Sequence, residues 1–277
     1  MSEQATHETL IKPRKGFSGL NFGELYKYRE LLYFLSLRDI KIRYKQTILG
    51  ASWAVLQPFT TMVVFTVIFG MMAGLPSEGI PYPIFAYSGL LLWTYFSKSV
   101  SSAGNSLVSN VNLVSKIYFP RLLISTSSTV SGLVDYVIAL AILALMMVYY
   151  GFAPGVGIIL LPYVVLVTFL LTNGLGYWFS ALNVQYRDLR YVLEFFTQLL
   201  FFLTPVIYPT SLGGEKYAWI FLMNPMSGLV NAHRASVLGH VAIDSTALLV
   251  SSLISIAIFV TGIIYFKKVE GEFADVI

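Results

Sequence analysis

The chain has 277 residues, of which 56% are hydrophobic and only 12% are charged, and its formal net charge is +4. Soluble domains usually carry about 25% charged residues, so this composition excludes an ordinary soluble domain and indicates a polytopic membrane protein. The sequence contains no cysteine, which excludes disulfides and thiolate chemistry. Its three histidines lack metal-ligand spacing, so we expect no metal and no cofactor on this chain.

The N-terminal 50 residues are polar and contain no pattern of a cleaved signal peptide. Residues 1–21 are expected to form a flexible cytoplasmic N-terminus. In residues 22–37, apolar side chains recur at helical spacing opposite charged ones, which predicts an amphipathic helix lying in the inner membrane interface. A short cytosolic helix packed on protein is the alternative. Residues 38–45 add four bases, and residues 22–52 together form this helix and a basic collar, for which a helix is favoured over a strand.

Six stretches are apolar enough to cross a membrane. A bilayer core about 30 Å thick needs roughly 20 apolar residues in a helix. The sequence therefore predicts an all-α fold with six transmembrane helices. Their approximate positions are residues 53–75, 83–103, 122–150, 156–182, 192–207 and 246–266.

The basic residues are distributed unevenly between the two sides of these spans. Sixteen of the 18 Lys and Arg residues fall before the first span, near the end of the second, in the links 104–121 and 183–191, or after the sixth. Only Lys216 and Arg234 fall on the other side. Because cytoplasmic loops are enriched in Lys and Arg, this asymmetry predicts that both termini are cytoplasmic.

The link 104–121 is predicted to contain a short helix on the cytoplasmic side. Its apolar residues recur with helical spacing, which a plain solvated loop would not need and which favours a docking surface for a cytosolic partner. The candidate docking residues are Val111, Val114, Lys116, Ile117 and Tyr118.

Residues 209–245 contain two apolar pieces that are each too short to cross the membrane and that are separated at Asn224-Pro225. Non-helical backbone at membrane depth persists only where it is buried in protein or lines a cavity. The sequence therefore favours two re-entrant half-helices between spans five and six, entering from the outer face. Two amphipathic helices lying on the outer surface are the alternative.

Three ionisable residues fall within the spans: Lys98, Asp135 and Glu194. A charge at the bilayer centre costs about 2.5–3.5 kcal/mol on insertion scales, so such residues usually face the protein interior. Asp135 follows a Ser/Thr-rich run at 125–132, which favours interhelical hydrogen bonding over a proton or substrate site. Glu194 is placed to reach Arg190, four residues earlier.

Aromatic residues make up 15% of the chain. Their first interpretation is contact with lipid and the membrane interfaces. The alternative is a conduit, because an aromatic face binds the apolar face of a sugar ring weakly and without fixing its register. The candidate conduit residues are Trp53, Phe59, Phe65, Phe69, Tyr87, Trp93, Phe96, Phe196 and Phe201.

The sequence lacks the nucleotide-binding and catalytic motifs expected of an enzyme. It contains no Gly-x-x-x-x-Gly-Lys-[Ser/Thr] loop for ATP and no nucleophile with its base. We therefore expect a non-enzymatic protein. A glycosyltransferase would need carboxylates at an interface, and the cytoplasmic loops offer only Asp188 and Glu194. A structural scaffold is a further alternative, against which the apolar periodicity of the link 104–121 argues.

Five separate segments resemble polysaccharide-exporting ABC-2 permeases, in the same order along the chain. They are "RDIKIRYKQTILGASWAVLQP" (38–58), "ALNVQYRDLR" (181–190), "LTPVIYP" (203–209), "NPMSGLVNAHRASVLG" (224–239) and "FADVI" (273–277). These permeases are the membrane subunits that export lipid-linked O-antigen, capsule or teichoic acid. The resemblance covers nearly the whole chain, and several motifs in the right order make it specific.

The resemblance implies an ABC-2 type transmembrane domain at 53–277 in a bacterial cytoplasmic (inner) membrane. Two copies of the chain would form the channel, and two copies of a cytosolic ABC ATPase would bind ATP and Mg and drive it. The substrate would be a lipid-linked polysaccharide, with membrane lipids as further partners and no nucleic acid. Residues 104–121 would be the coupling helix. The half-helices would form an outer gate, with candidate residues Asn224, Pro225, His233 and Arg234.

Two other transporter classes remain open at this point. A small-molecule or drug exporter of the ABC-2 superfamily would be expected to have a narrower path. An ion-coupled secondary transporter would be expected to use Asp135, although such a carrier would be expected to show more than one or two ionisable groups in its spans.

Overall fold

The computed structural model describes residues 22–45, 52–186, 188–239 and 242–273, and all regular structure within these ranges is helical. The predicted flexible segment 1–21 and residues 46–51 of the basic collar lie outside the described residues. The α-helices are α1 Phe22–Lys27, α2 Arg29–Lys45, α3 Ser52–Phe65, α4 Tyr82–Ser109, α5 Val111–Lys116, α6 Leu122–Tyr150, α7 Leu161–Gln185, α8 Leu189–Leu203, α9 Gly214–Met223, α10 Pro225–Leu238 and α11 Ser245–Val269. A π-helix, η1 Thr66–Met72, continues α3, and three 3₁₀ turns are η2 Val156–Leu160, η3 Thr210–Gly213 and η4 Glu270–Glu272.

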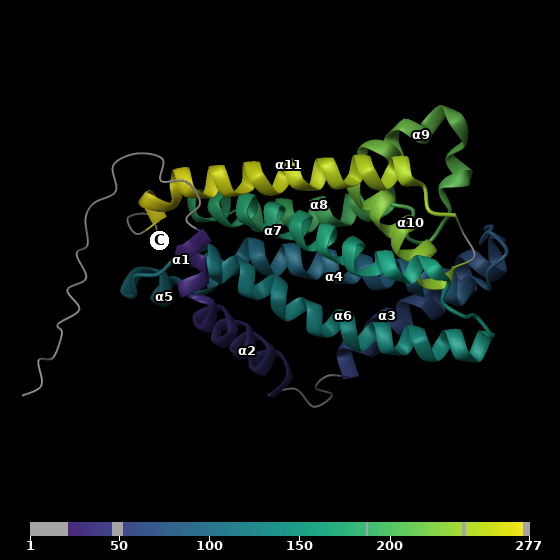
Figure 1. The fold of residues 1–277 in the computed structure, drawn as a ribbon, viewed down its shortest axis with the longest axis horizontal. Coiled ribbons are helices and arrows are strands. Elements are labelled where there is room, and N and C mark those ends of the chain that lie inside the picture. The colour runs from purple at the N-terminus through teal and green to yellow at the C-terminus, as the bar shows by residue number, and fades with distance from the viewer. Residues whose placement is uncertain (1–21, 46–51, 187, 240–241, 274–277) are drawn as a thin grey trace, which may run out of the picture.

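The long helices form one elongated bundle (Figure 1). Helix α7 packs against both α11 and α4, and α4 also packs against α6. The short helices α1 and α5 and the C-terminal end of α11 gather at one end of the bundle, which we call the α5 end (Figure 1). Helices α9 and α10 lie at the opposite end, which we call the α9 end, and α2 lies beside the part of α6 nearer the α5 end (Figure 1).

Four stretches within the described residues are long and apolar enough to cross a membrane: Val55–Met72, Leu122–Tyr150, Val156–Gln185 and Ser245–Val269. The chain is therefore a polytopic helical membrane protein. Helix α4 is long enough, with 28 residues, but carries many serines and Lys98. Helix α8 has 15 residues, fewer than the roughly 20 that a perpendicular span needs. Helices are present at all six predicted positions, and the crossing of the membrane by α4 and α8 stays a prediction.

The predicted helices are otherwise close to those observed. Helix α6 has the predicted bounds, the segment 38–45 is helical rather than a strand, and a short helix, α5, lies within 104–121. The segment 209–245 contains two helices, α9 and α10, that meet at Asn224. Whether these two helices are re-entrant stays a prediction.

Close backbone contact holds α7 to α11. A Cβ atom added to Gly174 would lie 2.6 Å from the Cα atom of Phe259, and one added to Gly262 would lie 2.4 Å from the carbonyl oxygen of Gly174. Small residues at a membrane helix interface allow backbones to approach closely and gain van der Waals contact. These two glycines are therefore required by the packing of the bundle.

Buried apolar side chains form two clusters. The larger one fills the centre of the bundle and its α9 end, between α4, α6, α7 and α10. The second cluster lies at the α5 end and joins α2, α5 and the C-terminal segment to the bundle through side chains such as Leu35, Val114, Phe119 and Phe273. The short helices at this end are thus anchored to the bundle by their own apolar core.

Candidate functional site

Helix α2 docks on α6 through polar side chains. Ser127 donates to Asp39 over 3.2 Å, and Arg43 donates to Ser131 over 3.4 Å. Further along α6, Asp135 forms an ion pair with Arg43 and accepts a hydrogen bond from Tyr44. The interpretation of Asp135 and the serine-rich run as interhelical hydrogen-bonding groups is therefore confirmed.

The opposite face of α2 is apolar and basic. Phe34 and Ile42 are exposed there and line a shallow groove of about 380 Å³ together with Lys41 and Lys45, and Tyr33 is exposed outside this groove. An exposed apolar face with flanking bases is typical of a helix that lies in a membrane interface. Helix α2 therefore contacts the bundle through these polar side chains and Leu35, while its other side is exposed, so that it separates the bundle from its surroundings.

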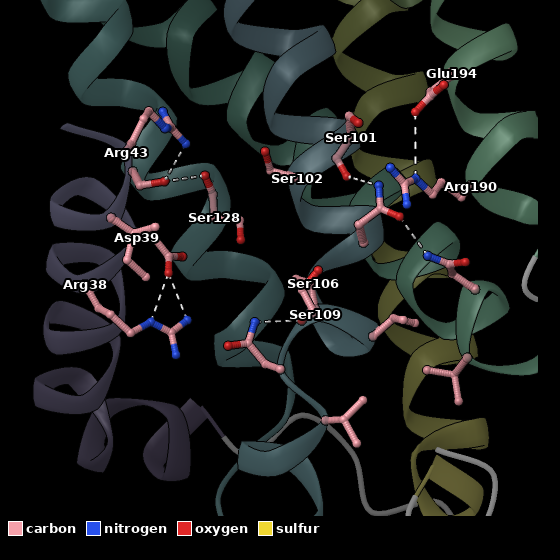
Figure 2. A pocket seen from close by; sticks show the side chains of 18 residues that line it. Arg38, Asp39, Arg43, Ser101, Ser102, Ser106, Ser109, Ser128, Arg190 and Glu194 are labelled. Carbon is pink, nitrogen blue, oxygen red and sulfur yellow. Dashed lines mark hydrogen bonds and ion pairs between the residues drawn. The ribbon is translucent and has the colours of Figure 1, made fainter. Parts of the chain in front are cut away.

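A pocket of about 910 Å³ lies between α2 and the bundle, towards the α5 end. Figure 2 shows Arg38, Asp39 and Arg43 of α2 on one side, Arg190 and Glu194 of α8 on the other, and serines of α4 between them. Further lining residues come from α5, α6 and α7: Val111, Ser128, Ser131, Asn183 and Val184. We call this space the inner pocket.

Each arginine that lines the inner pocket has a carboxylate partner. Arg38 pairs with Asp39 at 2.8 Å, and Arg43 pairs with Asp135. Arg190 lies 3.9 Å from Glu194, as predicted, but both side chains are mostly exposed, so this pair is loose. The charges around the pocket are thus largely balanced.

Hydroxyl and amide groups fill the wall between the charges. Asn183 of α7 donates to the backbone oxygen of Gly104 over 3.2 Å and to the side-chain oxygen of Asn105 over 3.0 Å. Asn105 in turn donates to the backbone oxygen of Ser101 over 2.9 Å. These bonds fix two amide side chains between α4 and α7. The wall is consequently rigid as well as polar.

The structure separates the predicted conduit aromatics into exposed and buried groups. Trp53 and Phe59 of α3 are exposed, whereas Phe65 and Phe69 are partly buried. On α4, Tyr87 and Phe96 are 0% exposed, and Trp93 is nearly as buried. A residue without exposed surface cannot line a conduit in this conformation of a single chain, so for these α4 rings that role stays a prediction that requires the bundle to open.

The α8 rings in the predicted set pack against the bundle. Phe201 lies 5.5 Å from Trp93 and 6.0 Å from Phe65, between ring centres, and Phe196 lies 5.6 Å from Phe179. Other aromatic side chains on the opposite face of α8 are exposed, namely Tyr191, Phe195 and Phe202. The candidate set omitted them, although the sequence carries a signal for their exposure: α8 is amphipathic, and these three rings lie beside its polar residues Arg190, Glu194 and Gln198.

The predicted docking residues also differ in exposure: some are buried and others are at the surface. Val114 is 3% exposed and belongs to the buried cluster at the α5 end, so its side chain anchors α5 instead of presenting a surface. Val111 is partly buried. Lys116, Ile117 and Tyr118 are exposed, the last of them to 70%. The exposed surface of this link is therefore formed by its last three candidates, and the docking of a partner there stays a prediction.

The four candidate gate residues lie on α10 and at its N-terminus, at the α9 end. Pro225 is the first residue of α10, and Asn224 caps that helix by accepting from the amide of Met226 over 3.1 Å. His233 is buried and its Nε2 lies 3.0 Å from the hydroxyl of Tyr136. Arg234 is only 2% exposed. The candidate gate side chains therefore do not form an exposed set in this conformation.

Asn224 and Arg234 hold the end of α8 and the non-helical residues 204–207 that follow it. Asn224 donates to the backbone oxygen of Leu203 over 3.2 Å. Arg234 donates to the backbone oxygens of Pro205 and Val206 over 3.2 and 2.9 Å, and its guanidinium carbon lies 3.7 Å from the ring centre of Phe85. Tyr82 of α4 donates to the oxygen of Ile207 over 2.7 Å. Irregular backbone at membrane depth needs such internal partners.

The inner pocket itself was not predicted. The signal was present in "SVSSAGNSLVSN" (99–110), where serine and asparagine recur along one helix at a spacing that brings several of them to one side. In the sequence this run reads as the end of a span and the start of a loop. Among the described residues, no group of three or more His, Asp or Glu side chains forms a metal site.

Comparison with known proteins gives the family. Residues 30–238 match the family described as ABC-2 type transporter. The chain is 32% identical over 255 residues to the O-antigen export system permease protein RfbA of Myxococcus xanthus, which covers 91% of this chain and 97% of the relative. It is 26% identical to a Klebsiella pneumoniae protein of the same name, over 93% and 97% of the two chains. It is 24% identical to the polysialic acid transport protein KpsM of Escherichia coli, over 74% and 80%.

Proposed function

Because this chain belongs to the ABC-2 type transporter family, we propose that it is the membrane-spanning permease subunit of an ABC transporter that exports lipid-linked polysaccharide across the bacterial cytoplasmic membrane. The observation that carries this proposal is similarity along more than 90% of the chain to O-antigen export permeases. The similarity to a polysialic acid transporter supports polysaccharide as the substrate class and does not favour a drug exporter.

The proposed topology has six spans, formed by α3 with η1, α4, α6, α7, α8 and α11. Both termini and the α5 end face the cytoplasm, and α9 and α10 form re-entrant half-helices at the outer face. The positive-inside rule supports this orientation, because Lys116, Arg121, Lys267 and Lys268 all belong to the α5 end. Arg234 is buried and internally bonded, so it does not count against it.

Energy is supplied by a separate ABC ATPase. This chain has no phosphate-binding loop, and the ATP and Mg belong to the partner. The contact surface on this chain is formed by Lys116, Ile117 and Tyr118, which are exposed beside α5. Val114 and Phe119 connect that surface to the buried cluster at the α5 end. A movement of the partner is therefore transmitted to α2 and to the C-terminal segment.

Two copies of the chain form the channel. Helices α3 and α8 both carry exposed apolar side chains, including Trp53 and Phe59 on α3 and Phe195 and Phe202 on α8. Contiguous exposed apolar surface of this kind suits contact with lipid, a second copy or a sugar-binding conduit. We place the conduit between the two copies, with the exposed rings of α3 and α8 along it.

The arrangement of α2 suits a substrate that is half lipid and half sugar. The polar part of the substrate would enter the inner pocket, while the lipid would remain in the membrane against the apolar outer face of α2. A proton-coupled carrier is less well supported, because Asp135 is bound by Arg43 and Tyr44 and does not face an aqueous path as a free acid.

Deletion of the chain's gene in its host tests the proposal. We expect loss of the polymer from the cell surface and accumulation of lipid-linked polymer inside, both restored by the wild-type chain. Inverted membrane vesicles should take up the lipid-linked polymer only with ATP, and a protonophore should have no effect. Unchanged surface polymer in the deletion strain, or uptake that needs a proton gradient instead of ATP, would contradict the proposal.

A further inference from the structure

The inner pocket is rich in groups that match a sugar better than a phosphate. We propose that it binds uncharged sugar residues of the exported polymer through the serines and asparagines of α4 and α7. This inference rests on the proposed function and deepens it, because it states which chemical part of the substrate the pocket recognises. The argument uses the charges, the hydroxyl groups and the size of the pocket.

The charges of the pocket do not favour a phosphate or pyrophosphate ligand. Phosphate sites in proteins usually present bases whose charge is available to the ligand. Here Arg38 is bound by Asp39, and Arg43 is bound by Asp135. Glu194 adds a further negative charge next to Arg190. A dianion entering this space would meet Asp39 beside Arg38 and Glu194 near Arg190, while the charge of Arg43 is offset by Asp135, which lies outside the pocket lining, so the attraction is weakened.

The hydroxyl groups of α4 are available to a ligand. Serines inside helices commonly bond to the carbonyl oxygen three or four residues earlier, as Ser106 does to Ala103 over 2.6 Å. Ser101, Ser102 and Ser109 line the same pocket and have no such bond among the described residues. A hydroxyl can both donate and accept, so it can pair with sugar hydroxyls of either orientation. This adaptability suits a polymer whose successive rings pass one position.

The amide groups supply fixed points in this wall. Asn105 and Asn183 are bonded to each other and to α4 backbone, so their side chains are held in place. A polar site with fixed donors and acceptors discriminates against ligands that lack the matching groups, because its own groups would be left unpaired. We therefore expect the pocket to prefer hydroxyl-rich rings over apolar molecules of similar size.

The size and position of the pocket also fit. Sites for small organic ligands usually have volumes of about 300–1,000 Å³, and the inner pocket has about 910 Å³. This is enough for a short stretch of a glycan together with water. Helix α2, which is pinned to α6 by Asp39 and Arg43, forms the wall between the pocket and the lipid-facing groove. The first sugars after a lipid carrier would therefore lie in the pocket.

The natural absence of cysteine makes this testable in the intact transporter. Single variants Ser102→Cys and Ser109→Cys place a thiol in the pocket, and Lys268→Cys places one on the exposed inner end of α11 outside it. Each is expressed with the partner ATPase, and labelling by N-ethylmaleimide is followed in inverted membrane vesicles. The probes are the repeat-unit oligosaccharide, released from the host's own polymer by mild acid, and inorganic pyrophosphate.

We expect the oligosaccharide to slow the labelling of Ser102→Cys and Ser109→Cys by about fivefold when it is present at about four times its Kd. Pyrophosphate should have no effect, and Lys268→Cys should be labelled at one rate throughout. Protection by pyrophosphate but not by the oligosaccharide would overturn the proposal. The proposal would also be overturned if the oligosaccharide left the labelling of both pocket variants unchanged in vesicles from cells that display normal surface polymer. That result would leave the export function itself intact.

Discussion

Arg43 and Asp135 lie 92 residues apart in the sequence and form an ion pair that joins α2 to α6. Tyr44 and Ser131 add hydrogen bonds to the same two side chains. Both members of the pair are partly buried, with 35% and 17% of their side chains exposed. The pair therefore fixes α2 against α6, at the wall of the inner pocket.

We expect Arg43→Ala and Asp135→Ala to lower the thermal stability of the purified permease by similar amounts, and the double variant to be scarcely worse than either. Residues in direct contact show coupling energies of about 0.5–3 kcal/mol in such cycles. The measurement is a double-mutant cycle on the unfolding temperature in detergent. Asp135→Asn should retain ATP-dependent export, and additive effects in the cycle would contradict the pairing.

Replacing Ile117 and Tyr118 by Asp should weaken binding of the partner ATPase and leave the permease folded, because both side chains are exposed. Val114→Asp should instead destabilise the permease by several kcal/mol, since it buries a charge in an apolar cluster. Co-purification with the ATPase and the yield of folded permease separate the two effects. Lys268→Asp is the matched surface control. Normal co-purification with Ile117→Asp and Tyr118→Asp would remove this surface from the coupling role.

Arg234→Ala should destabilise the permease, because the backbone oxygens of Pro205 and Val206 would lose their donor. Each buried polar group left unpaired costs about 1–3 kcal/mol. Arg234→Lys should rescue only part of this loss, since an ammonium group lacks the planar fork of the guanidinium. Lys216→Ala, at an exposed cation of α9, should change the unfolding temperature little. Equal stability of Arg234→Ala and wild type would refute the structural role of this arginine.

Gly262→Ala should loosen the packing of α7 on α11. The added Cβ atom would lie 2.4 Å from the backbone oxygen of Gly174, and overpacking of this kind typically costs about 1–3 kcal/mol. Gly271→Ala is the control, because nothing lies within 4 Å of a Cβ atom at that position. Thermal unfolding of both variants in the same detergent provides the comparison. A stability loss that is no greater for Gly262→Ala than for the control would show that the helices can move apart freely.

Phe195→Ala combined with Phe202→Ala should slow export while the permease still assembles, because these rings are exposed and not part of the core. Phe96→Ala should reduce the amount of folded permease by removing a fully buried ring, at a cost of about 3–5 kcal/mol. Surface polymer and membrane-inserted permease are measured in the same cells. Undiminished export by the α8 double variant would assign its exposed rings to lipid contact.

Much of the fold follows from local properties of the sequence. The extent of α6 and the break at Asn224-Pro225 depend on apolar length and on proline, both of which are visible without a structure. The position of α5 follows from periodicity within a few residues. These features involve neighbours in the chain, which is why they could be predicted.

The candidate site depends on contacts that the sequence does not encode locally. The partner of Asp135 lies 92 residues away, so only its need for a partner was foreseeable. Tyr87 and Phe96 lie on α4, whose buried residues occur around most of its circumference, so periodicity could not show that they face the core. The burial of Val114 could not be foreseen, because a short helix with several apolar side chains does not indicate which of them anchors it.

The hydrogen bonds to the end of α8 and to residues 204–207 limit how the α9 end of the protein can move. Asn224, Arg234 and Tyr82 bind four successive or nearly successive carbonyl groups of this stretch, at about 1 kcal/mol for each bond. Sliding α8 along its own axis would break these bonds together. Tilting it with its neighbours would keep them. Transport that displaces α8 should therefore carry α10 and the adjacent part of α4 with it as one rigid unit.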